Sequence, residues 1–89
     1  MVRVIKVHMV GGELHEHIAE VEWVDPATLD VGRSSRAGMV EFLEKPGSRA
    51  IVGEGANQVD VGVVRATPKY IRTYADGTWT NNLLSLPRY

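Results

Sequence analysis

Turn signals recur at short intervals along this chain, and they leave room for short strands and one helix. Gly11-Gly12 separates two runs rich in β-branched residues, Val2 to Val10 and Leu14 to Val24, which is the pattern of a β-hairpin. The register of this hairpin stays open, because a slip of one residue would move every side chain to the opposite face of the sheet.

The next segment predicts a loop followed by the helix. Asp25-Pro26 ends the second strand, and residues 25–33 read as a loop. Ser34 or Ser35 is placed to cap a helix that Pro46-Gly47 terminates. The periodic positions of this helix are Arg36, Met39, Val40 and Leu43, with Phe42 beside them.

The second half of the chain predicts three further strands. These strands are expected over Arg49 to Val52, Val59 to Val63 and Tyr70 to Tyr74, with a turn over Gly53 to Asn57 and a tight turn at Asp76-Gly77. We therefore predict one α+β domain over residues 1–89. A small, mostly antiparallel sheet in β-β-α-β-β-β order would pack on one helix, with the C-terminal segment folded onto the core.

The composition allows a packed core without cross-links. The chain has 89 residues, of which 44% are hydrophobic, and a net charge of −1. It has no cysteine, which excludes disulfides, thiolate zinc sites and cysteine nucleophiles. No apolar run reaches the roughly 20 residues of a membrane helix, and the first residues read as a strand and not as a signal peptide. We expect a cytoplasmic protein without membrane association.

The end of the chain carries the most specific pattern. It reads Tyr70-Ile71-Arg72-Thr73-Tyr74-Ala75-Asp76-Gly77-Thr78, then Asn81-Asn82-Leu83-Leu84-Ser85-Leu86-Pro87. This pattern resembles the closing signature of a small bacterial and phage family, the domain of unknown function 3892, although Asn81 stands where many relatives have Asp. The upstream layout is similar, so the resemblance covers most of the chain. It implies a fold, and it supplies no activity and no catalytic residue.

The residues of this tail also have a direct physical interpretation. Leu83, Leu84 and Leu86 are too apolar for a free end, so we expect them to cover the core. The guanidinium of Arg72 has five N–H donors, enough to bind the carbonyl groups of a segment folded over it. A structural role is therefore favoured for this signature over ligand binding.

No established catalytic motif is present in the sequence, and no catalytic residue is predicted. Gly53-Glu54-Gly55 reads as a turn, because it does not connect a strand to a helix as a phosphate-binding loop does. Glu16, Glu20 and Glu22 would share one face of the second strand, where carboxylates bind cations or exchange protons. A solvated face is favoured, with Arg3 opposite Glu20 if the hairpin is tight.

Basic and aromatic residues in the middle and the second half of the chain are the best candidates for binding. Protein interfaces favour Trp, Tyr and Arg, and the same combination binds single-stranded nucleic acid. The net charge of −1 disfavours the nucleic-acid interpretation. The candidate interaction surface comprises Arg65, Tyr70, Arg72, Tyr74 and Trp79. The nucleic-acid alternative would add Arg33, Arg36, Arg49 and Lys69.

The three histidines, His8, His15 and His17, form a candidate weak metal site. If Gly11 and Gly12 are the central residues of the hairpin turn, His8 faces His15 and Lys6 faces His17, so all three rings share one side of the hairpin tip. No thiolate is available to strengthen such a site. We expect it to be solvent-exposed and to bind metal only adventitiously.

These observations favour a small non-enzymatic interaction module. It would bind another protein or self-associate as a homo-oligomer, and we hypothesise an accessory role in a phage or mobile element. A nucleic-acid-binding module is the alternative, and a small-molecule or metal-binding protein is third. No cofactor is expected, because no cofactor-binding loop is present.

Overall fold

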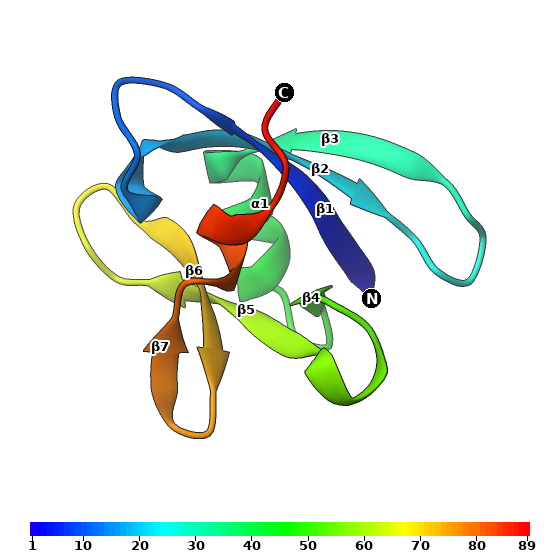
Figure 1. Cartoon of the computed structure of the whole chain (residues 1–89). Helices are drawn as coiled ribbons and strands as arrows, with labels where there is room; N and C mark the ends of the chain where they lie inside the picture. Colours follow the sequence, from blue (N-terminus) through cyan, green and yellow to red (C-terminus); the bar gives the residue numbers. More distant parts are fainter.

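In the computed structural model, which describes residues 1–89, a strongly curved sheet of seven strands surrounds one helix (Figure 1). The strands are β1 (Val2–Met9), β2 (Ile18–Val24), β3 (Val31–Ser35), β4 (Ala50–Val52), β5 (Val59–Val64), β6 (Tyr70–Ala75) and β7 (Thr78–Thr80). The helix is α1 (Arg36–Glu44), and three short 3-10 helices are η1 (His15–His17), η2 (Gly55–Asn57) and η3 (Asn82–Ser85).

The sheet order is β3-β2-β1-β4-β5-β6-β7. Only β1 and β4 pair in parallel, and the other neighbouring strands are antiparallel. The predicted small α+β fold with a mostly antiparallel sheet is therefore confirmed. The predicted β-β-α-β-β-β order is wrong, because one more strand precedes the helix and one more follows β6.

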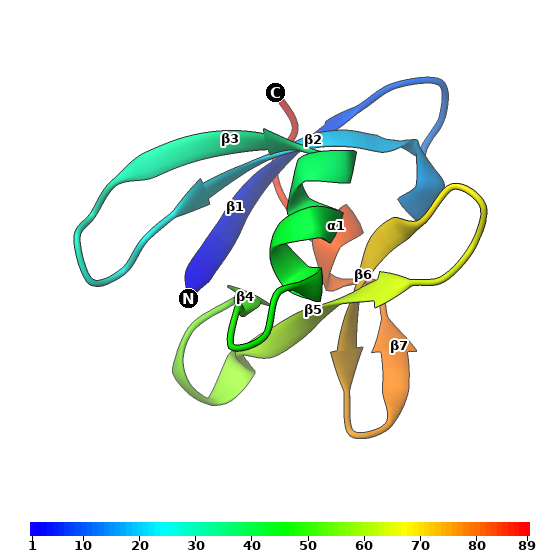
Figure 2. The same ribbon diagram turned by 180° about the vertical axis from the view of Figure 1, so that it is seen from behind.

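The core lies between α1 and the concave side of the sheet. Figure 2 shows α1 between the β1–β3 part of the sheet and the β5–β6 part, and α1 contacts both. The fully buried side chains include Val4, Val7, Ile18, Val21, Ala50, Ile71 and Leu83. None of the helices has the length and the apolar character that crossing a membrane requires.

Local signals set the ends of α1 as predicted. Ser35 is the N-cap, and its Oγ accepts a hydrogen bond of 3.0 Å from the backbone N–H of Gly38. Met39 and Val40 are buried, so the predicted apolar face points into the core. The helix ends at Glu44, just before Pro46-Gly47, where Gly47 has a positive φ of 81°.

The segment predicted as a loop over residues 25–33 contains the start of a strand instead. β3 begins at Val31 and pairs with β2 along its whole length, with Gly32 opposite Trp23. A Cβ atom at Gly32 would lie only 2.4 Å from the Trp23 ring, so a side chain has no room there. The strand therefore lacks the apolar alternation by which a strand is recognised in a sequence.

The first hairpin is longer than a tight turn at Gly11-Gly12. His8 pairs with Glu20 and Met9 with Ile18, so residues 10–17 form the connection. The register with His8 opposite His15 is wrong, and so is the pairing of Arg3 with Glu20, since Arg3 lies opposite Val24. A Cβ atom at Gly12 would lie 2.7 Å from the His17 ring, so the ring would have to move to admit a side chain there.

The C-terminal tail is part of the fold, as predicted. Leu83 is fully buried, and Leu84 and Leu86 pack against the core. After η3 the chain runs beside the second half of β1, where the N–H of Val7 donates to the carbonyl of Pro87 and the N–H of Tyr89 donates to the carbonyl of Val7. The tail thus occupies the edge of β1 that the short β4 leaves open.

Candidate interaction surface

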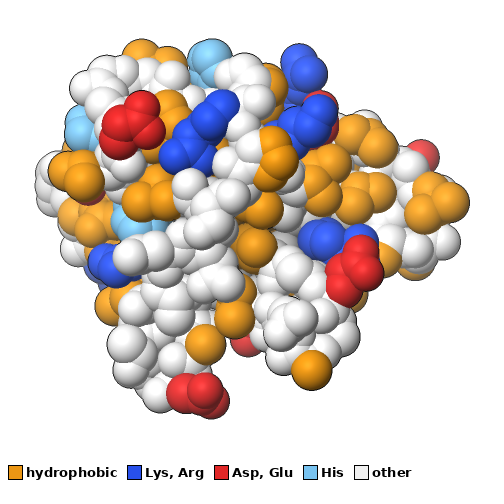
Figure 3. Space-filling view, in the orientation of Figure 1, with side chains coloured by type: hydrophobic (Ala, Val, Ile, Leu, Met, Phe, Trp, Pro, Cys, Tyr) orange, Lys and Arg blue, Asp and Glu red, His pale blue; other side chains and the backbone are white.

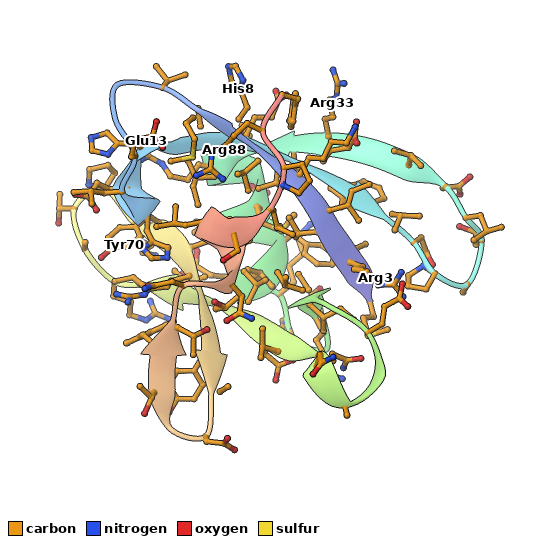
Figure 4. The ribbon with its side chains drawn as sticks, in the orientation of Figure 1. Arg3, His8, Glu13, Arg33, Tyr70 and Arg88 are labelled. Carbon is orange, nitrogen blue, oxygen red and sulfur yellow. The ribbon has the colours of Figure 1, made fainter.

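Side chains of β6 alternate between the two faces of the sheet, and this places the candidate binding residues of the strand on one face. Ile71 and Thr73 are fully buried on the core side. Tyr70, Arg72 and Tyr74 alternate with them and therefore lie on the opposite face. Tyr70 is half-buried, and Figure 4 shows it near η1, which packs against β6. Along β6, this face becomes accessible to solvent from Arg72 onward.

Tyr74 and Trp79 form an aromatic pair across the β6–β7 hairpin. They are directly paired in the ladder, and their ring centroids lie 5.1 Å apart at an interplanar angle of 72°. Such an edge-to-face arrangement is favourable for aromatic rings. Asp76 and Gly77 form the turn with positive φ values of 52° and 79°, which matches the turn type that joins two twisted strands. The ladder pairing and the ring contact together hold the two side chains in this geometry.

The indole of Trp79 extends across β6 to β5. A Cβ atom at Gly62 would lie 3.2 Å from Cζ3 of Trp79, so the glycine makes room for the ring. Tyr74 nevertheless remains 43% exposed and Trp79 38% exposed. Large aromatic side chains held this rigidly and left this accessible are typical anchors of protein interfaces.

Arg72 holds the tail and also borders the aromatic pair. Its Nε donates to the carbonyl of Thr80 at 3.1 Å, and its Nη2 donates to Oδ1 of Asn81 at 3.0 Å. The predicted bonding of Arg72 to the closing segment is thus present in the structure. We call Arg72, Tyr74 and Trp79 the aromatic face.

Arg65 lies apart from the aromatic face. It follows β5, and its Nη1 lies 3.5 Å from Oε2 of Glu44 at the end of α1. Lys69 contacts the same carboxylate at 2.7 Å, and its hydrogen bond lowers the pKa of Glu44. Arg49 pairs with Asp60 at 2.7 Å. Arg49, Arg65 and Lys69 are therefore each in contact with an acid, whereas Arg36 donates to the backbone carbonyl of Glu16. Figure 3 shows both charge signs interspersed on one face of the molecule.

The three histidines do not come together. His8 Nδ1 contacts the carbonyl oxygen of Tyr89, and His17 Nδ1 accepts a hydrogen bond from the N–H of Leu14. His15 is 7% exposed, and its Nε2 has no hydrogen-bond partner. Burial, together with the nearby charge of Arg72, lowers the pKa of His15. The structure contains no group of three His, Cys, Asp or Glu side chains arranged to hold a metal ion.

The glutamates expected on one face of β2 separate into two places. Glu16 lies in η1, outside the strand. Glu20 accepts a hydrogen bond of 2.8 Å from the hydroxyl of Tyr89, and Glu22 pairs with Lys6 and Arg33. Burial and the bond to Glu20 raise the pKa of Tyr89 to about 12. The Glu20 carboxylate therefore helps to hold the tail against the sheet.

Sequence reasoning did not anticipate the cluster around Tyr89. The guanidinium carbon of Arg33 lies 4.6 Å from the centroid of the Tyr89 ring, and the His8 ring packs 5.4 Å from the same ring. These residues are far apart in the chain and meet only because the tail runs beside β1. No local sequence signal could have revealed this contact.

The fold and this surface define a small α+β domain that presents rigid aromatic side chains on the outside of a curved sheet. Over residues 3–87 the chain matches the model of a family described as "Protein of unknown function (DUF3892)", and the chain belongs to this family. No curated protein and no solved structure matches it significantly.

Proposed function

We propose that the chain is a non-enzymatic interaction module that binds another protein through the aromatic face. The observation that supports this proposal is the half-exposed Tyr74–Trp79 pair, which β6, β7 and Gly62 fix in one geometry. Rigid aromatic side chains lose little conformational entropy when they bind, so their contact area contributes efficiently to affinity. Arg72 at the border adds a cationic donor of the kind that interfaces favour.

The charges around the aromatic face favour a protein over a nucleic acid. Asp60 lies directly opposite Tyr74 in the ladder and already pairs with Arg49. Asp76 adds a negative charge at the hairpin turn. A surface that neutralises several phosphates needs unpaired cations, and in this region Arg72 is the main one that is not paired with an acid. We therefore rank nucleic-acid binding second, as the alternative to protein binding.

The proposal is tested by capturing partners from the source cell and measuring binding of the purified partner by calorimetry. Trp79→Ala should weaken binding at least tenfold, since truncating a central aromatic anchor typically costs about 2 kcal/mol or more. Val10→Ala is the matched control, because Val10 is 59% exposed but lies in the β1–β2 connection. It should leave the affinity unchanged.

Two results would contradict the proposal. One is a partner that binds the parent, the Trp79→Ala variant and the Val10→Ala variant equally well. The other is sub-micromolar binding of single-stranded DNA or RNA that persists at physiological salt, which would favour the nucleic-acid alternative. Sedimentation of the protein alone would separate self-association from binding of a different protein.

A further inference from the structure

β3 is an open edge of the sheet. It pairs with β2 on one side only, and no other strand or loop of the chain forms backbone hydrogen bonds with it; its last residue, Ser35, is also the N-cap of α1. Alternate residues of such a strand direct their N–H and C=O groups away from the sheet, where an added strand can pair with them. The edge spans five residues, enough for several main-chain hydrogen bonds.

The inner face of β3 carries no bulky side chain of its own. The Trp23 ring occupies the space beside Gly32, and Ser34 contributes only a hydroxyl, which accepts a hydrogen bond of 3.0 Å from Nε1 of Trp23. Beside Ser34 is a small, mostly apolar pocket of about 110 Å³, lined by Val2, Trp23, Ser34, Met39 and Phe42. A cavity of about 150 Å³ holds a benzene molecule, so this pocket suits one aliphatic side chain.

The outer face of β3 carries a positive charge and an apolar residue. The Arg33 side chain is 58% exposed, and Figure 4 shows it projecting from β3 into solvent. Its Nε contacts Glu22 at 3.2 Å, which leaves its terminal nitrogens available to an acidic partner. Val31 is 62% exposed, and Figure 3 shows hydrophobic side chains gathered over the β2–β3 hairpin.

We propose that the β3 edge binds an extended segment of another protein by strand addition. The segment would place an aliphatic side chain inward, into the pocket beside Ser34, and an acidic side chain outward, opposite Arg33. This is the general mode in which main-chain pairing provides affinity and alternate side chains provide specificity. The proposal concerns the opposite end of the sheet order from the aromatic face and does not depend on it.

A second copy of the chain does not fit this edge as well. Antiparallel pairing of two β3 strands about a two-fold axis keeps their inner faces on the same side. Each copy would then present Gly32 and Ser34 to the pocket of the other, and the pocket would stay empty. Two Arg33 side chains would also approach each other, which is unfavourable.

In the test, three capped heptapeptides are titrated to low-millimolar concentration into the full ¹⁵N-labelled chain, and binding is followed by NMR. The first alternates Glu and Leu, the second Glu and Ser, and the third Lys and Leu. The Glu/Leu peptide should bind best, shift the signals of β3 and of the pocket residues, and protect amides of residues 31–35 from hydrogen exchange. The Glu/Ser peptide, which lacks the leucines, should bind roughly ten- to a hundredfold more weakly than the Glu/Leu peptide.

Variants of the protein distinguish the contribution of the pocket to binding from the contribution of the Arg33 charge. Ser34→Leu fills the pocket from within and should weaken the Glu/Leu peptide about tenfold or more, whereas Ser34→Ala leaves the pocket open and should not. Arg33→Glu should reverse the preference between the Glu/Leu and Lys/Leu peptides. The amide spectrum of each variant verifies that the fold is retained, and Arg33→Glu remains informative if Ser34→Leu does not fold.

Three results would overturn the proposal. The peptides could cause no shifts, or shifts remote from β3. They could bind Ser34→Leu and Ser34→Ala equally, with no change in charge preference in Arg33→Glu. The unliganded protein could already show protected outer-edge amides on β3 and sediment as a dimer, which would identify a second copy as the occupant.

Discussion

Replacing Leu83 with alanine should destabilise the protein strongly. The Leu83 side chain is fully buried in the core cluster. Truncating a buried leucine to alanine costs about 2–5 kcal/mol, because apolar contacts are lost and a cavity remains. A chain of this length is expected to have a free energy of unfolding of about 4–13 kcal/mol. The substitution therefore removes a large fraction of the total stability.

Urea denaturation followed by tryptophan fluorescence measures this loss. With a slope of about 1–2 kcal/mol per molar urea, a cost of 3 kcal/mol lowers the midpoint by about 1.5–3 M. Leu14→Ala makes the same chemical change at a side chain that is 57% exposed, and it should shift the free energy by about 0.5 kcal/mol or less.

The reasoning would be refuted if Leu83→Ala moved the midpoint no further than Leu14→Ala. The tail would then contribute little to the core despite its contacts. If the alanine variant does not fold, Leu83→Met should fold with a smaller loss, below about 1.5 kcal/mol, because the volume is nearly conserved.

Three further predictions concern the polar groups that hold the tail and the β1–β2 connection. Because the pKa of His15 is lowered in the folded state, the unfolded chain binds a proton more readily than the folded chain. The free energy of unfolding should therefore fall as the pH drops below about 6.5 and through the folded-state pKa. The urea midpoints at pH 7.5 and 5.5 should differ less in His15→Leu than in the parent protein. Thr73→Val removes the buried hydroxyl that accepts from the N–H of Asn82 and the hydroxyl of Thr80, and should cost about 1–3 kcal/mol in thermal unfolding. Arg72→Lys should cost about 1–2 kcal/mol in the same assay, and an unchanged melting temperature would exclude a structural role for its planar donors.

Strands and the helix were predictable where the sequence pattern and the burial pattern coincide. The limits of α1 followed from Ser35 and from Pro46-Gly47, and β5 and β6 followed from alternating residues between turn signals. In each case a local preference and the tertiary environment require the same conformation. The burial of the tail was also predictable, because its leucines have no favourable alternative in water.

The parts that were not predictable depend on contacts between distant residues. β3 lacks an apolar pattern because Trp23 occupies the space beside Gly32, and the bulk of a neighbouring strand is invisible in the local sequence. In the first hairpin the His17 ring lies close to Gly12, and the two adjacent glycines suggested a tight turn that does not form. The grouping of the aromatic face required β7, which is too short to be recognised from its own pattern.

The closing signature can now be interpreted residue by residue. Arg72 binds the carbonyl of Thr80, Thr73 receives the N–H of Asn82, and Leu83 fills the core, so each of these positions closes the fold. Trp79 is different: no side-chain hydrogen bond holds it, it is partly exposed, and it lies between the two halves of the signature. The residues that carry the resemblance to the family thus explain how the tail is attached. The binding that we propose involves other positions, Trp79 and Arg33, whose side chains are partly exposed.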